Sequence, residues 1–182
     1  MEDQPIQISK INDFLYSPES LYLHSLYEKF DIQTYKDAPQ ITGNLNHKAI
    51  DTKRYSSSKN WLQGTTVYSS KYEIIGKIDI FDIDTCTLIE RKTMIKTLHL
   101  GYIYQLFAQM FCLQEMGFTV EHLVIRSLTD NKKYVIELPN SKDILCFKKL
   151  LLDMRNFEPL DLLSVPEIDQ KSHNSIYGEL NF

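Results

Sequence analysis

The sequence predicts a single domain of the mixed α/β class, of the α+β type, in which a mixed sheet is flanked by helices. Three observations support this prediction. The chain has 182 residues, a length that suits one domain with a hydrophobic core. Runs rich in β-branched residues occupy its middle, and segments with a helical spacing of apolar residues stand before, between and after them. The expected order of elements is α-α-β-β-β-α-β-β-α.

The first part of the chain is predicted to be helical. Apolar residues recur at helical spacing over residues 9–29, with Ser9 as a candidate N-cap and an interruption at Pro18. Residues 31–40 have the composition of a loop. A short helix is expected over residues 43–55, and it contains His47.

Three strands are expected in the middle of the chain. Residues 65–70 form the first, and residues 72–83 form the second because isoleucines are frequent there. Residues 82–85 can turn the chain, and residues 87–92 then return as the third strand.

The second half is predicted to alternate between helix and strand. An apolar helix spans residues 98–116, and Gly117 can end it. Strands follow over residues 120–127 and 134–138, joined by a turn at Asp130 and Asn131.

A last helix closes the predicted fold. Asn140 or Ser141 can cap it, and it extends to about residue 156. The stretch after Phe157 is expected to be irregular, because Pro159 and Pro166 interrupt regular structure.

Composition excludes several classes of protein. Apolar residues make up 43% of the chain and aromatic residues 12%, as in ordinary globular proteins. The sequence contains no apolar run of the length that spans a bilayer and no visible secretion signal, so we expect a cytoplasmic protein that does not act at a membrane. A formal net charge of −4 argues against coating nucleic acid by bulk charge. The net charge is still compatible with a local track of basic residues that binds nucleic acid. The candidates for such a track are Arg91, Lys92, Lys96, Lys132, Lys133, Lys148 and Lys149.

The three cysteines do not indicate a cysteine-based site. Cys86, Cys112 and Cys146 are widely spaced and form no C-x-x-C pair. We therefore expect all three to be buried as small hydrophobic residues.

One pair of segments suggests chemistry. Asp79 follows Gly76-Lys77-Ile78, and Glu90 and Lys92 lie two apart in the next expected strand, so their side chains point to one face. If the two strands pair through the turn near Asp84, Asp79 lies beside them. Two carboxylates on one face repel each other, and a divalent cation would relieve that repulsion.

These residue types suit a metal-dependent phosphodiesterase. Carboxylate oxygens are the ligands that Mg²⁺ and Mn²⁺ prefer, and such ions also bind substrate phosphate. A lysine beside them can orient the attacking water and stabilise charge that develops on the phosphate. A histidine ligand such as His47 would shift the expected preference towards Mn²⁺.

The order of these motifs resembles the RecB-like branch of the PD-(D/E)-x-K nucleases. The pattern comprises a helical histidine at His47, G-x-x-D over residues 76–79, E-x-K over residues 90–92, and a helical glutamine at Gln105. The opening segment, residues 8–24, is similar to the start of the CRISPR-associated Cas-four family, in the compact form that accompanies type V effectors. The resemblance extends over essentially the whole chain, which it divides into a helical region over residues 1–56, a nuclease core over residues 57–157 and a tail over residues 158–182.

The resemblance implies an exonuclease of prokaryotic spacer acquisition. Such an enzyme trims the single-stranded 3′ overhangs of prespacer DNA, helps to select the end that bears the PAM, and works with the Cas-one–Cas-two integrase. Lys92 would be the catalytic lysine, with Asp79 and Glu90 as catalytic metal ligands. Further implied ligands are His47 and the backbone carbonyl of Arg91, and the implied substrate contacts are Gln105, Tyr104, Lys77 and Lys96.

One departure from the family concerns its iron–sulfur cluster. The four positions of the cysteine ligands correspond here to Ser17, Ser172, Ser175 and Asn181, none of which can supply a thiolate. We therefore expect no cluster, and Mg²⁺ or Mn²⁺ as the cofactor. A second departure is Gln109, which stands where the family has the tyrosine of Q-x-x-x-Y.

Two alternatives to an active nuclease remain open from the sequence. In the first, the protein recognises DNA ends or the PAM for the integrase without cutting. In the second, it is a structural subunit that assembles with the integrase.

Overall fold

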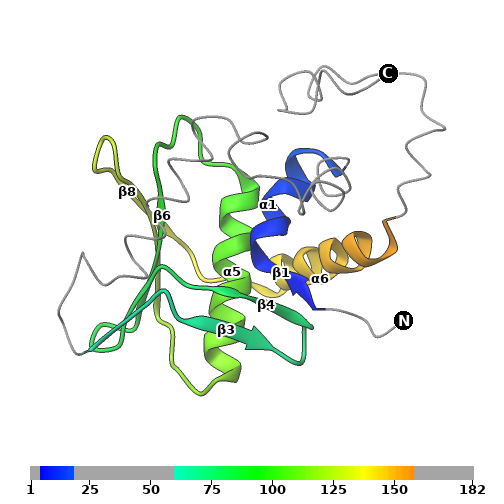
Figure 1. Cartoon of the computed structure of the whole chain (residues 1–182), viewed down its shortest axis with the longest axis horizontal. Coiled ribbons are helices and arrows are strands. Elements are labelled where there is room, and N and C mark those ends of the chain that lie inside the picture. Colours follow the sequence, from blue (N-terminus) through cyan, green and yellow to red (C-terminus); the bar gives the residue numbers. More distant parts are fainter. Residues whose placement is uncertain (1–4, 19–59, 158–182) are drawn as a thin grey trace, which may run out of the picture.

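The computed structural model describes residues 5–18 and 60–157, and it confirms a mixed α/β fold of the α+β type. Two sheets and three helices make up this part of the chain (Figure 1). The larger sheet has the order β2-β5-β6-β7-β8. Its strands are β2 (Trp61–Gln63), β5 (Ile80–Asp82), β6 (Thr87–Lys92), β7 (His122–Ser127) and β8 (Lys133–Ile136).

The smaller sheet has the order β1-β4-β3. It consists of β1 (Ile6–Gln7), β4 (Ile74–Lys77) and β3 (Thr66–Ser69). The β1–β4 pair is parallel and the β3–β4 pair is antiparallel, while in the larger sheet only β6 and β7 run parallel. Helix α5 (Leu100–Glu115) packs on one face of the larger sheet, and the smaller sheet contacts α5 and α1 (Ile8–Tyr16).

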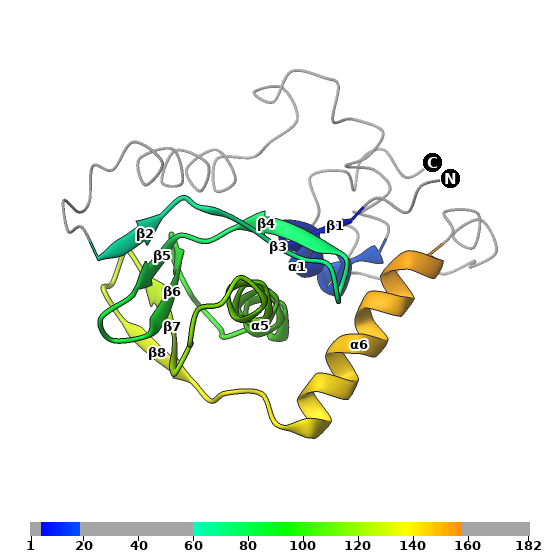
Figure 2. The ribbon, with the colours of Figure 1, turned by 90° about the horizontal axis from the view of Figure 1, so that it is seen from below.

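The helix α5 (Leu100–Glu115) is the centre of the fold. Viewed end-on in Figure 2, it lies between the β3–β4 hairpin, the five-stranded sheet and the other two helices, α1 (Ile8–Tyr16) and α6 (Ser141–Asn156). A helix that is apolar on nearly all sides is normally buried. Its buried residues are Gly101, Tyr104, Leu106, Phe107, Ala108, Gln109, Met110, Phe111, Cys112 and Leu113.

Helices α1 and α5 approach each other closely at a glycine. A Cβ added at Gly101 would lie 3.1 Å from the Cα of Asn12, closer than side chains tolerate against backbone. Glycine therefore allows α1 to pack on the N-terminal turn of α5, beside the end of β6.

The structure confirms several predicted elements. The strand over residues 87–92 and the helix after Asn140 have the expected bounds, and Asn140 caps α6 by accepting hydrogen bonds from the N–H groups of Lys142 and Asp143. Asp143 returns a hydrogen bond to the N–H of Asn140, which completes a capping box.

Other predictions were wrong. The single strand expected over residues 72–83 is divided into β4 and β5, because the first half pairs with β3 and the second with β6. Helix α1 begins at Ile8, so Ser9 lies inside it and is not its N-cap. Cys112 is buried as expected, but Cys86 is only half-buried and Cys146, on α6, is exposed.

Some predictions concern residues that the structure does not describe. These are the loop over residues 31–40, the helix over residues 43–55 with His47, and the tail that contains Ser172, Ser175 and Asn181. In the described ranges, no helix combines the length and apolar character that crossing a bilayer requires.

Candidate active site

The β5–β6 hairpin brings the predicted acidic residues together. Ile80 pairs with Ile89 in antiparallel register, so extending the register by one residue places Asp79 opposite Glu90. The side chain of Asp82 supports the turn by accepting a hydrogen bond from the N–H of Asp84 at 3.1 Å. Asp79 itself stands at the point where the chain leaves one sheet and enters the other.

Asp79 is fixed against the neighbouring strand. Its Oδ2 accepts a hydrogen bond of 2.7 Å from the backbone N–H of Arg91, and the residue is only 2% exposed. This hydrogen bond holds the Asp79 carboxylate beside Arg91, the residue between Glu90 and Lys92 in β6.

Glu90 is fully buried, and three side chains hold its carboxylate. Oε1 accepts hydrogen bonds from Lys92 Nζ at 2.9 Å and from Gln105 Nε2 at 2.8 Å. Oε2 accepts one from Gln109 Nε2 at 2.8 Å, and that nitrogen also donates to the carbonyl of Lys77 at 3.1 Å. A buried carboxylate needs such donors, since leaving it without them is costly.

Lys92 links the strand to the central helix. Its Nζ donates to Gln105 Oε1 at 2.8 Å and lies 4.9 Å from the centre of the Tyr102 ring, within the range of a cation–π contact. The Lys92 side chain is 18% exposed, whereas Glu90 is inaccessible, so the lysine is on the solvent side of the group. We call Asp79, Glu90, Lys92, Gln105 and Gln109 the acid–lysine cluster.

Charge and burial shift the pKa values inside the cluster. Burial raises the pKa of Glu90 above its ordinary value, and the nearby charge of Asp79 raises it further. Burial acts to lower the pKa of Lys92, but the charge and hydrogen bond of Glu90 outweigh it and the pKa is raised. Lys92 therefore remains an ammonium ion that donates hydrogen bonds.

A polar stripe on α5 completes the cluster. Tyr102, Gln105 and Gln109 stand at positions i, i+3 and i+7, which share one helix face. The motif order predicted Gln105 as a site residue, but Tyr102 was not predicted and Gln109 was noted only as a departure from the family pattern. Their spacing from Gln105 was the signal that could have found them, because polar residues on an apolar helix at this spacing face one partner.

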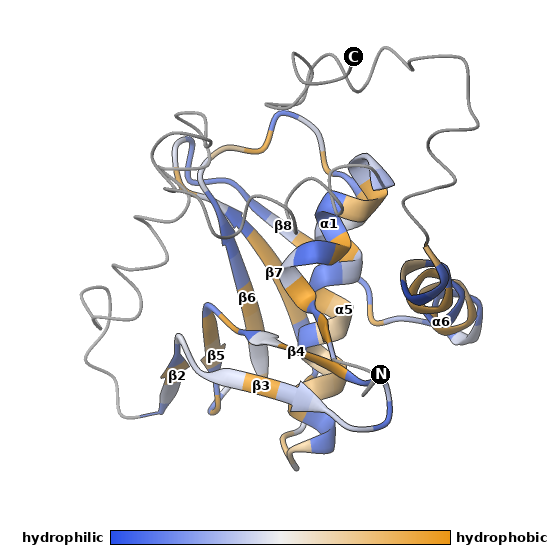
Figure 3. Cartoon of the chain, turned by 45° about the vertical axis from the view of Figure 1, so that its right-hand side comes forward, coloured by the Kyte–Doolittle hydropathy of each residue, from blue (hydrophilic) through white to orange (hydrophobic). Residues whose placement is uncertain are grey.

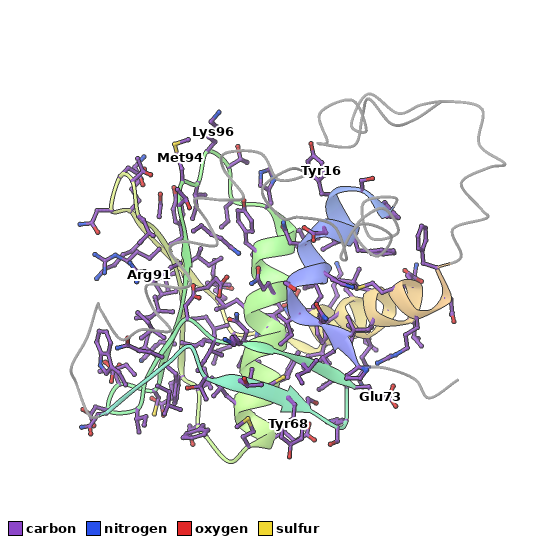
Figure 4. The ribbon with its side chains drawn as sticks, in the orientation of Figure 1. Tyr16, Tyr68, Glu73, Arg91, Met94 and Lys96 are labelled. Atoms are coloured by element: carbon purple, nitrogen blue, oxygen red, sulfur yellow. The ribbon has the colours of Figure 1, made fainter. Side chains whose placement is uncertain are left out.

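The remaining predicted site residues lie outside the cluster. Lys77 contributes its carbonyl to Gln109, while its side chain is exposed. Lys96 is exposed in the loop between β6 and α5, beyond the end of the strand (Figure 4). Ser17 is buried at the C-terminal end of α1, where its N–H donates to the carbonyl of Asp13 at 2.9 Å. His47 is outside the described residues.

The placement of Tyr104 does not match its predicted role as a substrate contact. It is 9% exposed, and its ring packs against Phe107 and Phe147 in the core between α5 and α6. Positions 104 and 105 are about 100° apart around the helix. The Tyr104 ring is therefore directed towards Phe147 of α6, while Gln105 faces β6. The tyrosine that contacts the cluster is instead Tyr102, which lies one turn before Gln105 and packs against Lys92.

The donor chemistry of the cluster fits a hard cation in part. Asp79 and Glu90 supply carboxylate oxygens, and Oε2 of Glu90 accepts a hydrogen bond from Gln109 alone in the described part of the chain, which leaves it a lone pair. Within residues 5–18 and 60–157, however, no three His, Cys, Asp or Glu side chains gather as a metal site. A full ligand set therefore needs donors beyond these two carboxylates.

Comparison with known proteins supports the fold alone. No protein-family model matches the sequence, and no curated protein matches it. Among solved structures, the chain is similar to the crystal structure of SSO0001, with a TM-score of 0.61 and 16% sequence identity over 99% of this chain and 87% of that one. At this level of identity the likeness concerns the arrangement of helices and strands.

Proposed function

We propose that this chain is a Mg²⁺- or Mn²⁺-dependent deoxyribonuclease of the RecB-like branch of the PD-(D/E)-x-K nucleases. The observation that supports it most directly is the hydrogen-bonded group of Asp79, Glu90 and Lys92 on neighbouring strands. An ordinary surface lysine and glutamate would not be buried together and held by two glutamines of a central helix.

Each residue has a distinct part in the proposed reaction. Asp79 and Glu90 would hold the cation, with the carbonyl of Arg91 and His47 as further ligands. When bound, the cation would neutralise charge on the scissile phosphate and make a water molecule more acidic. Lys92 would orient the attacking water and stabilise charge on the phosphate through its ammonium hydrogens. Gln105, which contacts both Glu90 and Lys92, fixes the distance between acid and lysine.

The physiological substrate in this proposal is prespacer DNA. The E-x-K cluster and the motif order support a member of the CRISPR-associated Cas-four family without its iron–sulfur cluster. Such a protein would trim single-stranded 3′ overhangs, contribute to selection of the PAM-bearing end and act in the prokaryotic cytoplasm with the Cas-one–Cas-two integrase.

A nuclease assay tests the proposal directly. The purified chain should shorten end-labelled single-stranded DNA with Mn²⁺ or Mg²⁺ and lose this activity in excess EDTA. Asp79→Ala and Lys92→Ala should each reduce the rate by about 100-fold or more, since each removes a group acting on the transition state. Matched controls on the exposed side of α6, Asp153→Ala and Lys142→Ala, should retain the wild-type rate. If the folded wild type cleaves no DNA with either metal, the enzyme proposal is wrong.

A further inference from the structure

Three cationic side chains stand side by side across the larger sheet. Arg91 of β6 pairs with Arg126 of β7, and Arg126 pairs with Lys133 of β8. Residues that are directly opposite on adjacent strands point to the same face, about 4.8 Å apart. We call these three residues the basic row.

The basic row is on the face of the sheet that points away from α5. Glu90 and Lys92 contact glutamines of α5, and Arg91 between them must point the opposite way because side chains alternate along a strand. Figure 4 shows the Arg91 side chain extending from β6 away from α5. The burial patterns agree, since Leu88, Glu90, Leu123 and Ile125 are buried whereas Arg91 and Arg126 are half-buried and Lys133 is exposed.

The like charges of Arg126 and Lys133, which are directly opposite each other, are electrostatically unfavourable. Like charges directly opposite each other destabilise a sheet. Within the described ranges, neither Arg126 nor Lys133 forms an ion pair, and the Arg126 guanidinium donates to the neutral amide oxygen of Asn131. The chain has a formal net charge of −4, so a row of three cations does not follow from a basic composition.

An apolar row lies beside the basic row on the same face. Ile89, Val124 and Val135 are also cross-strand neighbours, two residues along each strand from the cations. Val135 is 79% exposed, and Ile89 and Val124 are half-buried. The hydropathy colouring of Figure 3 shows the same change along β6, from hydrophobic in its middle to hydrophilic towards its end.

We infer that the basic row binds the phosphate backbone of single-stranded DNA on this outer face of the sheet, with bases lying over the apolar row. Guanidinium groups suit phosphate because they donate two parallel hydrogen bonds. Proteins that bind single strands combine such cations with side chains that contact the base faces, usually aromatic ones, and in this inference the aliphatic side chains of the apolar row take that place. An acidic peptide offers carboxylates to the same cations, so competition by polyglutamate distinguishes it from DNA. The inference rests on the proposed function in taking DNA as the substrate.

The position of the row relates binding to cleavage. Arg91 is the residue between Glu90 and Lys92, so its Cα is about 3.8 Å from theirs. DNA bound on the row would therefore lie one sheet thickness from the acid–lysine cluster and could reach it around the end of β6. This makes the row an anchor for the strand, separate from the groups that act on the scissile phosphate.

A binding titration tests the inference without relying on cleavage. The full chain and the variant Arg126→Gln/Lys133→Gln are titrated onto a fluorescent single-stranded oligonucleotide in EDTA, at several salt concentrations. We expect the Kd of the variant to rise on the order of tenfold and the slope of log Kd against log salt to fall by about 1.4, or about 0.7 for each lost phosphate contact. The variant Lys71→Gln/Lys142→Gln, which removes the same charge from exposed positions away from the row, should bind as the wild type does.

Two further measurements separate the possible outcomes. Because Lys133→Gln removes a like charge without removing a hydrogen bond, the Tm of this single variant should equal or exceed that of the wild type, and a lower Tm would contradict the electrostatic argument. Unchanged DNA binding by the double row variant, or equal competition by polyglutamate, would overturn the inference even if the wild type cleaves DNA. Salt-dependent binding that the row mutations weaken would support it even if no cleavage is found, so the failure of one proposal does not imply the failure of the other.

Discussion

Glu90 shows how much of the candidate site depends on single hydrogen bonds. Its carboxylate has no contact with solvent, and Gln105 and Gln109 of α5 hold its two oxygens separately. Gln109 also reaches the carbonyl of Lys77, so one amide nitrogen connects β4, β6 and α5. Its own Oε1 is buried and has no hydrogen-bond partner among the described residues, so the amide group is held by the two hydrogen bonds that its nitrogen donates.

Replacing Gln109 with leucine tests this arrangement. Gln109→Leu keeps a similar volume but removes the donor that Glu90 Oε2 shares with the Lys77 carbonyl, so we expect the free energy of unfolding to fall by about 1–3 kcal/mol. Urea denaturation in EDTA measures this change. The control Gln114→Leu, at an exposed position of the same helix, should shift it by less than about 0.5 kcal/mol. Equal effects of the two substitutions would show that Gln109 does not support Glu90.

At the scale of elements, Glu115 ties the end of α5 to the β3–β4 hairpin. Its carboxylate accepts a hydrogen bond from the Ser69 hydroxyl and another, at 2.8 Å, from the N–H of Ser70. The Ser69 hydrogen bond is the main reason that the pKa of Glu115 lies below its ordinary value of 4.5. Because the Glu115 carboxylate is exposed, the contact is expected to contribute little to the free energy of unfolding. Its effect should be easier to detect as a change of stability with pH.

The sign of that dependence follows from the lowered pKa. As the pH falls below 4.5, the unfolded chain takes up a proton at Glu115 before the folded chain does, so stability falls until the folded-state pKa is passed. The contribution is fully present above pH 4.5. We therefore expect Glu115→Gln to lose Tm less steeply than the wild type on acidification from about pH 6 to about pH 3. Glu137→Gln, at an exposed position after β8, serves as the control and should follow the wild-type curve.

Local patterns predicted some elements well and others poorly. The bounds of β6 and α6 follow from local sequence signals. Strand β6 begins after a predicted turn, and α6 begins at the Asn140 cap, with Asp143 three residues later. The break between β4 and β5 has no local signal, because isoleucines continue across it and only the pairing partners differ. With two and three residues, β1 and β2 are too short to show any periodicity.

The same limit applied to the candidate site. Alternation along β6 was enough to put Glu90 and Lys92 on one face. The position of Asp79 opposite Glu90, in contrast, depends on the register of β5, and the role of Gln109 depends on how α5 is rotated against the sheet. The turn near Asp84 allowed the approach of Asp79 to Glu90 to be predicted on the condition that the two strands pair, whereas no local pattern fixes the rotation of α5 that brings Gln109 to Glu90.

For the whole molecule, the central position of α5 argues that both sheets fold together. The helix is buried against the β3–β4 hairpin, the five-stranded sheet and α1, and its ring contacts reach Phe147 of α6. Neither sheet has a second layer of its own in the described part of the chain that would replace α5. If one sheet unfolded, apolar residues of α5 would become exposed. The other sheet would then lose stability as well, because it packs on the same helix.

We accordingly expect one cooperative unfolding transition for this core. The single tryptophan, Trp61, lies in β2 at the edge of the five-stranded sheet, so its fluorescence follows that sheet, whereas far-ultraviolet circular dichroism follows mainly the helices. If α5 couples the elements, the two signals should give the same urea midpoint, and calorimetric and van't Hoff enthalpies should agree. Separate midpoints, with the fluorescence change preceding the loss of helix, would mean that the five-stranded sheet can open while α5 stays packed on the hairpin. In that case the acid–lysine cluster, which requires β6 and α5 together, would be lost before the helices unfold.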